Sequence, residues 1–115
     1  MKMSGPARGE VWSVDLDPAR GHEQAGTRPA LVISVDEFNG GPADLVVLLP
    51  ITTREKGIPF HVRVDPPEGG LKAVSFIKCE DVRSISKERL ARRLGRVLPR
   101  TIAEVEFRLR VLLKL

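Results

Sequence analysis

Short apolar stretches, separated by turns rich in glycine and proline, occupy most of the chain. In some of them apolar and polar positions alternate, and others are continuously apolar; both patterns predict β-strands. The five predicted strands are residues 10–18, 28–35, 43–52, 59–65 and 72–82. The continuous apolar run in the second indicates burial on both faces. Several short strands at this spacing are typical of a small barrel or sandwich.

The hydrophobic pattern changes to a helical period at the C-terminal end. Residues 99–115 place five aliphatic side chains on one helical face. These side chains are Ile102, Val105, Leu109, Leu112 and Leu113. Thr101 follows Pro99 and is itself followed three residues later by Glu104, which is the pattern of a capping box. A C-terminal helix is therefore predicted.

Residues 86–98 carry two competing patterns. Ser86 could cap a short helix that ends at Leu90, whereas the alternation around Gly95 favours a sixth strand. We therefore expect a mainly β fold, a small antiparallel barrel closed by the C-terminal helix. The 115 residues are expected to form one domain, residues 1–115, long enough to bury a core without disulfides.

Charge is distributed unevenly along the chain. The whole sequence has a formal charge of +4, but residues 83–115 hold ten basic and three acidic residues, a net charge of +7. Such a skew suits a polyanion such as nucleic acid, although an acidic protein partner or an ordinary solvated surface would explain it equally. A single cysteine, the absence of a signal-peptide pattern and the shortness of every apolar run lead us to expect a cytoplasmic protein without a membrane span.

Several kinds of chemistry find no support in the composition. The two histidines and one cysteine, at positions 22, 61 and 79, show no metal-ligand spacing, so no metal or other cofactor is expected. No glycine-rich loop that could hold a phosphate precedes the helix. Five aromatic residues offer little stacking surface, so RNA binding would depend on electrostatics and hydrogen bonds.

The segment GHEQAGTRP, residues 21–29, concentrates chemically capable side chains between two glycines and a proline. It brings together an imidazole, a carboxylate, an amide, a hydroxyl and a guanidinium, from His22, Glu23, Gln24, Thr27 and Arg28. Taken alone, these residues are compatible with an exposed polar loop. Strand propensity likewise accounts for Thr52 and Thr53.

Four segments together resemble the MazF/PemK (Kid) family of toxin endoribonucleases from toxin–antitoxin modules. They are residues 8–18, 21–34, 46–60 and 79–86. The resemblance implies an SH3-like barrel with a C-terminal helix, as in MazF, PemK and CcdB, acting as a homodimer. It implies metal-independent, sequence-selective cleavage of single-stranded RNA, usually mRNA, with 2′,3′-cyclic phosphate and 5′-hydroxyl products. It also implies a cognate MazE-like antitoxin whose acidic tail covers the active groove.

The resemblance assigns three catalytic candidates in the first half of the chain. Arg28 matches the family's catalytic arginine, and its guanidinium is a rigid fork of donors suited to phosphate oxygens. Thr52 matches the active-site threonine, whose hydroxyl can donate to a phosphate oxygen. Glu23 matches an acidic position used in some members and is a candidate base.

A second set of candidates comes from the PemK/Kid branch. That branch also has a histidine before the glutamate, as His22 here, and an arginine–cysteine–aspartate tripeptide that acts as acid and base. This chain has Lys78-Cys79-Glu80 instead, with a point donor in place of a fork and a longer carboxylate. Glu80 could alternatively form a surface ion pair with Arg83, and Cys79 is interpreted as buried filler rather than a nucleophile.

Base selectivity is expected to come from the loops at residues 35–44 and 53–60. Asn39, Arg54 and Lys56 are the candidates there for reaching bases or phosphates. The other expected RNA contacts are Gln24, Thr27, Thr53 and Arg83.

Two competing functions remain open. A CcdB-like gyrase poison shares the fold, but that branch depends on an apolar C-terminus with tryptophan, and no tryptophan follows Trp12 here. A non-enzymatic nucleic-acid-binding module on the same scaffold is the third possibility. Cleavage of single-stranded RNA in the presence of a chelator would separate the ribonuclease from both.

Overall fold

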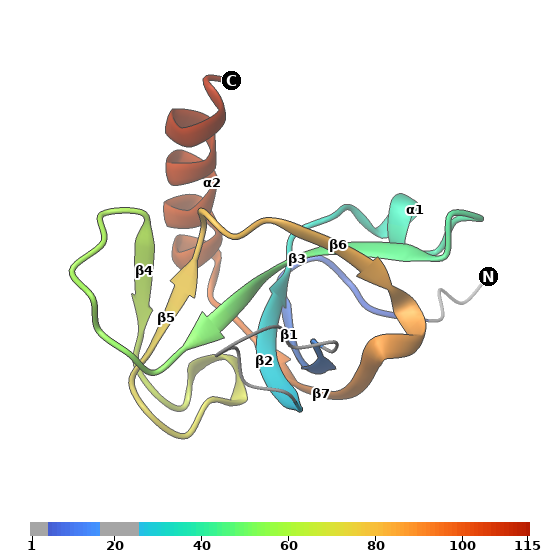
Figure 1. Cartoon of the computed structure of the whole chain (residues 1–115), viewed down its shortest axis with the longest axis horizontal. Coiled ribbons are helices and arrows are strands. Elements are labelled where there is room, and N and C mark those ends of the chain that lie inside the picture. Colours follow the sequence, from blue (N-terminus) through green and yellow to red (C-terminus); the bar gives the residue numbers. More distant parts are fainter. Residues whose placement is uncertain (1–4, 17–25) are drawn as a thin grey trace.

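The computed structural model describes residues 5–16 and 26–115. Within these ranges the chain forms strands, two α-helices and two 3-10 turns (Figure 1). In chain order they are β1 (Glu10–Asp15), β2 (Thr27–Val32), α1 (Asp36–Asn39), β3 (Leu45–Thr52), β4 (His61–Val64), η1 (Glu68–Gly70), β5 (Ser75–Lys78), β6 (Arg83–Ser86), η2 (Lys87–Arg89), β7 (Leu90–Arg96) and α2 (Pro99–Leu113).

The strands form one strongly twisted antiparallel sheet in the order β4-β5-β3-β2-β1-β7. β6 pairs with the first half of β3, and β5 pairs with its last two residues. The prediction of a mainly antiparallel β fold with a C-terminal helix is confirmed. Among the described strands no ladder joins β6 to β7, so the sheet curls without closing into a barrel.

All five predicted strands form and are shorter than predicted, although β2 begins one residue earlier, at Thr27. Both patterns seen in residues 86–98 are present, because a 3-10 turn at Lys87–Arg89 is followed directly by β7. The segment 72–82 was wrongly predicted as one strand. A turn, closed by a hydrogen bond of 3.0 Å from Asp81 N to Lys78 O, ends β5, and a separate strand β6 follows.

The sheet is buried on both faces. One core cluster includes Leu31, Leu49 and Val105, and lies between the sheet and α2. The second, which includes Ala30 and Leu48, fills the inside of the curl. Neighbouring residues of a strand point to opposite faces, so β2 and β3 must be apolar at successive positions. This confirms the burial predicted from the continuous run in residues 28–35.

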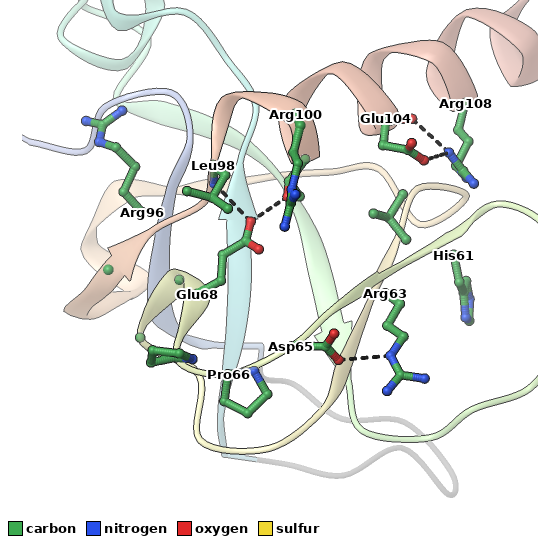
Figure 2. Close-up of a pocket in the computed structure, with 16 residues that line it drawn as sticks. His61, Arg63, Asp65, Pro66, Glu68, Arg96, Leu98, Arg100, Glu104 and Arg108 are labelled. Carbon is green, nitrogen blue, oxygen red and sulfur yellow. Dashed lines mark hydrogen bonds and ion pairs between the residues drawn. The ribbon is translucent and has the colours of Figure 1, made fainter.

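The start of α2 is fixed from outside the helix. The predicted capping box is wrong, because no side chain caps the helix from the N-cap residue Leu98. Instead the carboxylate of Glu68 accepts hydrogen bonds from Leu98 N (2.9 Å) and from the Thr101 hydroxyl (Figure 2). Glu104 accepts a hydrogen bond from Arg108, one turn later.

Only the first half of the predicted apolar helix face is covered. Val105 is buried, and Ile102 and Leu109 pack against the core. Leu112 and Leu113 are exposed, because the second half of α2 extends beyond the sheet (Figure 1).

The Glu68 side chain reaches the helix because η1 lies directly on β7. A Cβ atom at Gly70 would stand 2.0 Å from the carbonyl oxygen of Leu94, and one at Gly95 would stand 2.6 Å from the backbone of Gly69. Gly70 also has a φ of 71°, in the left-handed region that favours glycine. Two glycines are therefore required at this crossing of two backbones.

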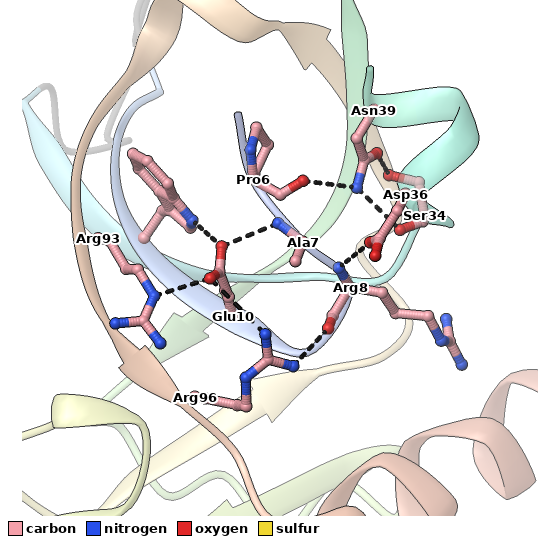
Figure 3. A network of polar contacts seen from close by, with 10 residues as sticks. Pro6, Ala7, Arg8, Glu10, Ser34, Asp36, Asn39, Arg93 and Arg96 are labelled. Carbon is pink, nitrogen blue, oxygen red and sulfur yellow. Dashed lines mark hydrogen bonds and ion pairs between the residues drawn. The ribbon is translucent and has the colours of Figure 1, made fainter. Parts of the chain in front are cut away.

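A buried carboxylate joins the N-terminal segment to the sheet (Figure 3). Glu10 is 9% exposed, and its Oε1 accepts hydrogen bonds from Ala7 N (2.8 Å) and Trp12 Nε1 (3.0 Å). Its Oε2 accepts one from Arg93 Nε (2.8 Å). Burial alone would raise the pKa of Glu10, but the hydrogen bonds from Ala7, Trp12 and Arg93 outweigh it and hold that pKa below its ordinary value. This carboxylate is ionised and holds segment 7–10, β1 and β7 together.

Candidate active site

Arg28 and Thr52 belong to adjacent strands, near the end where β2 and β3 diverge (Figure 1). The β2–β3 ladder pairs Ala30 with Pro50 and Val32 with Leu48. By the alternation of a strand, Arg28 takes the face of Ala30 and Thr52 takes the face of Pro50. Beyond this ladder, Thr52 pairs with Phe76 of β5.

The side chains of both residues have donor groups available for a ligand. Arg28 is half-buried and forms no hydrogen bond or ion pair in the described part of the chain. The Thr52 Oγ1 accepts a hydrogen bond of 3.1 Å from Arg54 N, and its hydroxyl proton donates to none of the described residues. A guanidinium fork and a hydroxyl in this state suit the oxygens of a phosphodiester.

Part of the predicted site lies outside the described residues. His22, Glu23 and Gln24 belong to residues 17–25, so their roles stay predictions. The described chain resumes at Gly26, two residues before Arg28. Thr27 is exposed at the start of β2, opposite Asp15.

Lys78 and Arg83 both pair with an acid that the sequence analysis did not single out. Arg83 donates two hydrogen bonds to the Asp81 carboxylate (3.0 and 3.1 Å), and Lys78 Nζ lies 3.5 Å from it. Burial raises the pKa of Asp81, but the hydrogen bonds and charges of Arg83 and Lys78 outweigh this and lower it. Asp81 pairs with one predicted catalytic residue, Lys78, and with one predicted RNA contact, Arg83, and the alternative pairing of Glu80 with Arg83 is wrong.

Glu80 pairs with a histidine instead. His61 Nε2 and Glu80 Oε2 are 2.8 Å apart, and the side chains are 4% and 32% exposed. His61 stands directly opposite Lys78 in the β4–β5 ladder. Sequence reasoning considered His61 only as a metal ligand. The signal available was the alternation in residues 59–65, which sets His61 on the face away from Val62.

Cys79, which lies between Lys78 and Glu80 in the sequence, is fully buried. Burial raises the pKa of its thiol to about 11, so the thiol stays protonated at neutral pH. The interpretation of Cys79 as buried filler is confirmed.

The two loops predicted to contact RNA differ. Thr53, Arg54 and Lys56 are exposed in the connection that follows Thr52 directly. The prediction for Asn39 is wrong, because this residue is 1% exposed. Its amide nitrogen donates to the carbonyls of Pro6 and Ser34, and its side-chain oxygen accepts from the Ser34 hydroxyl. Asn39 therefore ties α1 to the N-terminal segment.

A separate groove of about 1000 Å³ lies between β4, η1 and the first half of α2 (Figure 2). His61 and Arg63 line it, and neither Arg28 nor Thr52 does. Within residues 5–16 and 26–115, no group of three or more histidine, cysteine or acidic side chains could hold a metal ion. None of the helices described there is long and apolar enough to cross a membrane.

The fold and this face define a small, curled β protein with a C-terminal helix and an arginine–threonine pair suited to a phosphodiester. The chain belongs to the family of PemK-like, MazF-like toxins of type II toxin–antitoxin systems, whose model matches residues 7–113.

Relatives and solved structures cover nearly the whole chain. The sequence is 39% identical over 113 residues to endoribonuclease MazF9 of Mycobacterium tuberculosis, spanning 94% of this chain and 96% of that protein. It is 37% identical over 118 residues to endoribonuclease PemK of Escherichia coli, spanning 97% and 85%. The structure of MazF from Deinococcus radiodurans superposes with a TM-score of 0.81 at 34% identity, covering 96% of this chain and 98% of that one. A mycobacterial endoribonuclease in complex with its cognate antitoxin gives a TM-score of 0.81 at 27% identity, covering 96% and 97%.

Proposed function

We propose that this chain is a toxin endoribonuclease that cleaves single-stranded RNA, chiefly mRNA, at selected sequences and without a metal ion. The observation that carries the proposal is a half-buried guanidinium, that of Arg28, which no described residue pairs, on a strand whose neighbour β3 carries Thr52. The family, and relatives named endoribonucleases that span nearly the whole chain, support it.

The reaction uses the RNA's own 2′-hydroxyl as nucleophile. The 2′ oxygen bonds to the adjacent phosphorus as the bond from phosphorus to the 5′ oxygen breaks, which leaves a 2′,3′-cyclic phosphate and a 5′-hydroxyl. The protein must accept the 2′ proton, stabilise the negative charge on the phosphorane and protonate the leaving oxygen. A positioned acid or base contributes about 10²–10⁴-fold to such a rate, and preorganised donors contribute about 10²–10³-fold each.

Arg28 and Thr52 donate to the non-bridging oxygens, where charge develops. The proton-transfer candidates are Glu23, His22, Glu80 and Lys78, of which Lys78 must first leave Asp81. The RNA strand is held by further polar side chains around this face. The proposed contacts are Gln24, Thr27, Thr53, Arg54, Lys56 and Arg83.

The proposed partners of this chain rest on its positive C-terminal third and on the uncovered half of α2. Phe107, Val111, Leu113 and Leu115 are exposed, and they suit a homodimer interface. The net charge of +7 in residues 83–115 suits both RNA and the acidic tail of a MazE-like antitoxin. The expected compartment is the cytoplasm, where mRNA is translated.

The test is cleavage of a long single-stranded RNA by the purified protein in the presence of a chelator. The wild type should cleave it and leave 2′,3′-cyclic phosphate ends. Arg28→Ala should keep its circular dichroism spectrum and lose about 10²–10³-fold in rate, because the charge on the phosphorane loses its main donor. Lys72→Ala removes an exposed cation that lies outside residues 83–115 and outside the proposed contacts; it is the control and should cleave normally.

Three results would count against the proposal. Wild-type cleavage by a folded Arg28→Ala variant would remove the catalytic assignment. Gyrase inhibition without RNA cleavage would favour a CcdB-like poison. RNA binding without cleavage would favour a binding module.

A further inference from the structure

The pair formed by His61 and Glu80 has a geometry that simple packing does not explain. The His61 side chain is 4% exposed, and its Nε2 lies 2.8 Å from Glu80 Oε2. Its Nδ1 is buried and has no hydrogen-bond partner in the described part of the chain. An aliphatic side chain would fill this position without leaving a polar atom unpaired. The single hydrogen bond to Glu80 is therefore what the imidazole adds.

The neighbouring cations are all engaged elsewhere. Lys78 stands directly opposite His61 in the ladder, and its Nζ forms an ion pair of 3.5 Å with the Asp81 carboxylate. Arg108, which lines the same groove as His61, donates to the carbonyl oxygen of Pro59 and to Glu104 (Figure 2). Glu80 accordingly has one partner among the described residues, His61, and its Oε1 stays available to accept a proton or a hydrogen bond.

We propose that His61 is a positioning residue, which holds the Glu80 carboxylate in one orientation so that its free oxygen faces the RNA. This role rests on the proposed ribonuclease activity, in which Glu80 is one of the proton-transfer groups. His61 supplies an N–H from a rigid ring anchored in β4, whereas Glu80 lies in the turn between β5 and β6. Without that donor the carboxylate samples several rotamers, and fewer of them point at the substrate.

The experiment compares His61→Leu, which removes the donor, with His61→Gln, whose amide nitrogen replaces Nε2. With the full-length protein and a short single-stranded RNA, His61→Leu should lower kcat about 10-fold and leave KM unchanged. His61→Gln should recover most of kcat. Val64→Ala is the matched control, because it removes buried packing from the same strand but not the hydrogen bond; it should lose stability and keep kcat.

A double-mutant cycle tests whether His61 acts through Glu80. In a Glu80→Gln background, His61→Leu should cause no further loss of kcat. A multiplicative loss would overturn the proposal, and so would a folded His61→Leu variant with wild-type kcat. If His61→Leu does not fold, His61→Asn takes its place, because its shorter amide cannot reach Glu80.

Failure of this inference is distinguishable from failure of the proposed function. If Arg28→Ala is inactive but the His61 variants match the wild type, only the positioning role falls. If the wild type does not cleave RNA, both fall. A nitrogen-15 spectrum of the His61 ring then reports the pairing itself, because Glu80→Gln should shift the Nε2 resonance only if the hydrogen bond exists in solution.

Discussion

Two carboxylates in this protein, Glu10 and Glu80, differ in their burial and in the number of hydrogen bonds that they accept. Glu10 is 9% exposed, and both of its oxygens accept hydrogen bonds, from three different donors. The Glu80 side chain is 32% exposed and has one partner on one oxygen. A fully bonded, buried carboxylate holds chain segments together and has no capacity for chemistry. A carboxylate fixed at one oxygen and open at the other is suited to proton transfer.

The largest effect is expected when the charge of Glu80 is removed. Glu80→Gln should lower RNA cleavage by about 10²–10⁴-fold, since an amide cannot accept the proton. Its unfolding free energy should change by less than about 0.5 kcal/mol, because the residue is exposed. Cleavage assays and urea unfolding check both parts, and a wild-type rate would contradict the contrast.

The same substitution at Glu10 should affect only the stability of the fold. Glu10→Gln places an amide N–H against the Arg93 donor, so one charge-assisted hydrogen bond is lost. We expect a loss of about 1–3 kcal/mol in the free energy of unfolding, with kcat unchanged at temperatures where the variant is folded. A drop in kcat without a loss of stability would show that Glu10 acts in catalysis and not in holding the fold together.

Acid sensitivity should test the structural role of Glu10. The pKa of Glu10 in the folded protein lies below its ordinary value of 4.5. Its contribution to stability is therefore complete above that value and is lost as the pH falls through the folded pKa. The free energy of unfolding, measured from about pH 6 to about pH 3, should decline less for Glu10→Gln than for the wild type. Equal declines would exclude Glu10 as a source of acid sensitivity.

The smallest effect is expected at Asp81, which lies between the two extremes. Asp81→Asn should change the free energy of unfolding by less than about 1 kcal/mol, because its ion pairs are partly exposed. It removes the carboxylate charge beside Lys78, so RNA should bind a few-fold more tightly and with a steeper dependence on salt. Filter binding at several salt concentrations measures this, and unchanged affinity would place Lys78 away from the RNA.

The sequence predicts the parts of this fold that depend on local periodicity. The five strands and the C-terminal helix follow from patterns of apolar residues a few positions apart. The strand predicted over residues 72–82 was too long because buried Cys79 continues the alternation through a turn, and β6, which follows at Arg83–Ser86, was not predicted. The covered length of α2 was overestimated, since periodicity does not show where the sheet beneath a helix ends.

Contacts between distant segments escaped prediction for a different reason. The Glu68 cap of α2 and the pairing of His61 with Glu80 depend on strand register, which single-residue patterns do not give. Arg28 and Thr52 were found through a resemblance, because no local pattern singles them out, and their joint role stays a prediction. The prediction for Asn39 failed because a polar residue in a loop was taken to be exposed, whereas it is a buried connector.

The crossing of η1 and β7 has a consequence for the surface that a partner meets. Where backbone rests on backbone there is no side chain to trim or enlarge, so the spacing between η1 and β7 cannot be adjusted gradually by substitutions at Gly70 and Gly95. Glu68, on the same turn, holds the start of α2, so the exposed apolar end of that helix extends beyond the sheet from a point fixed on this crossing (Figure 1).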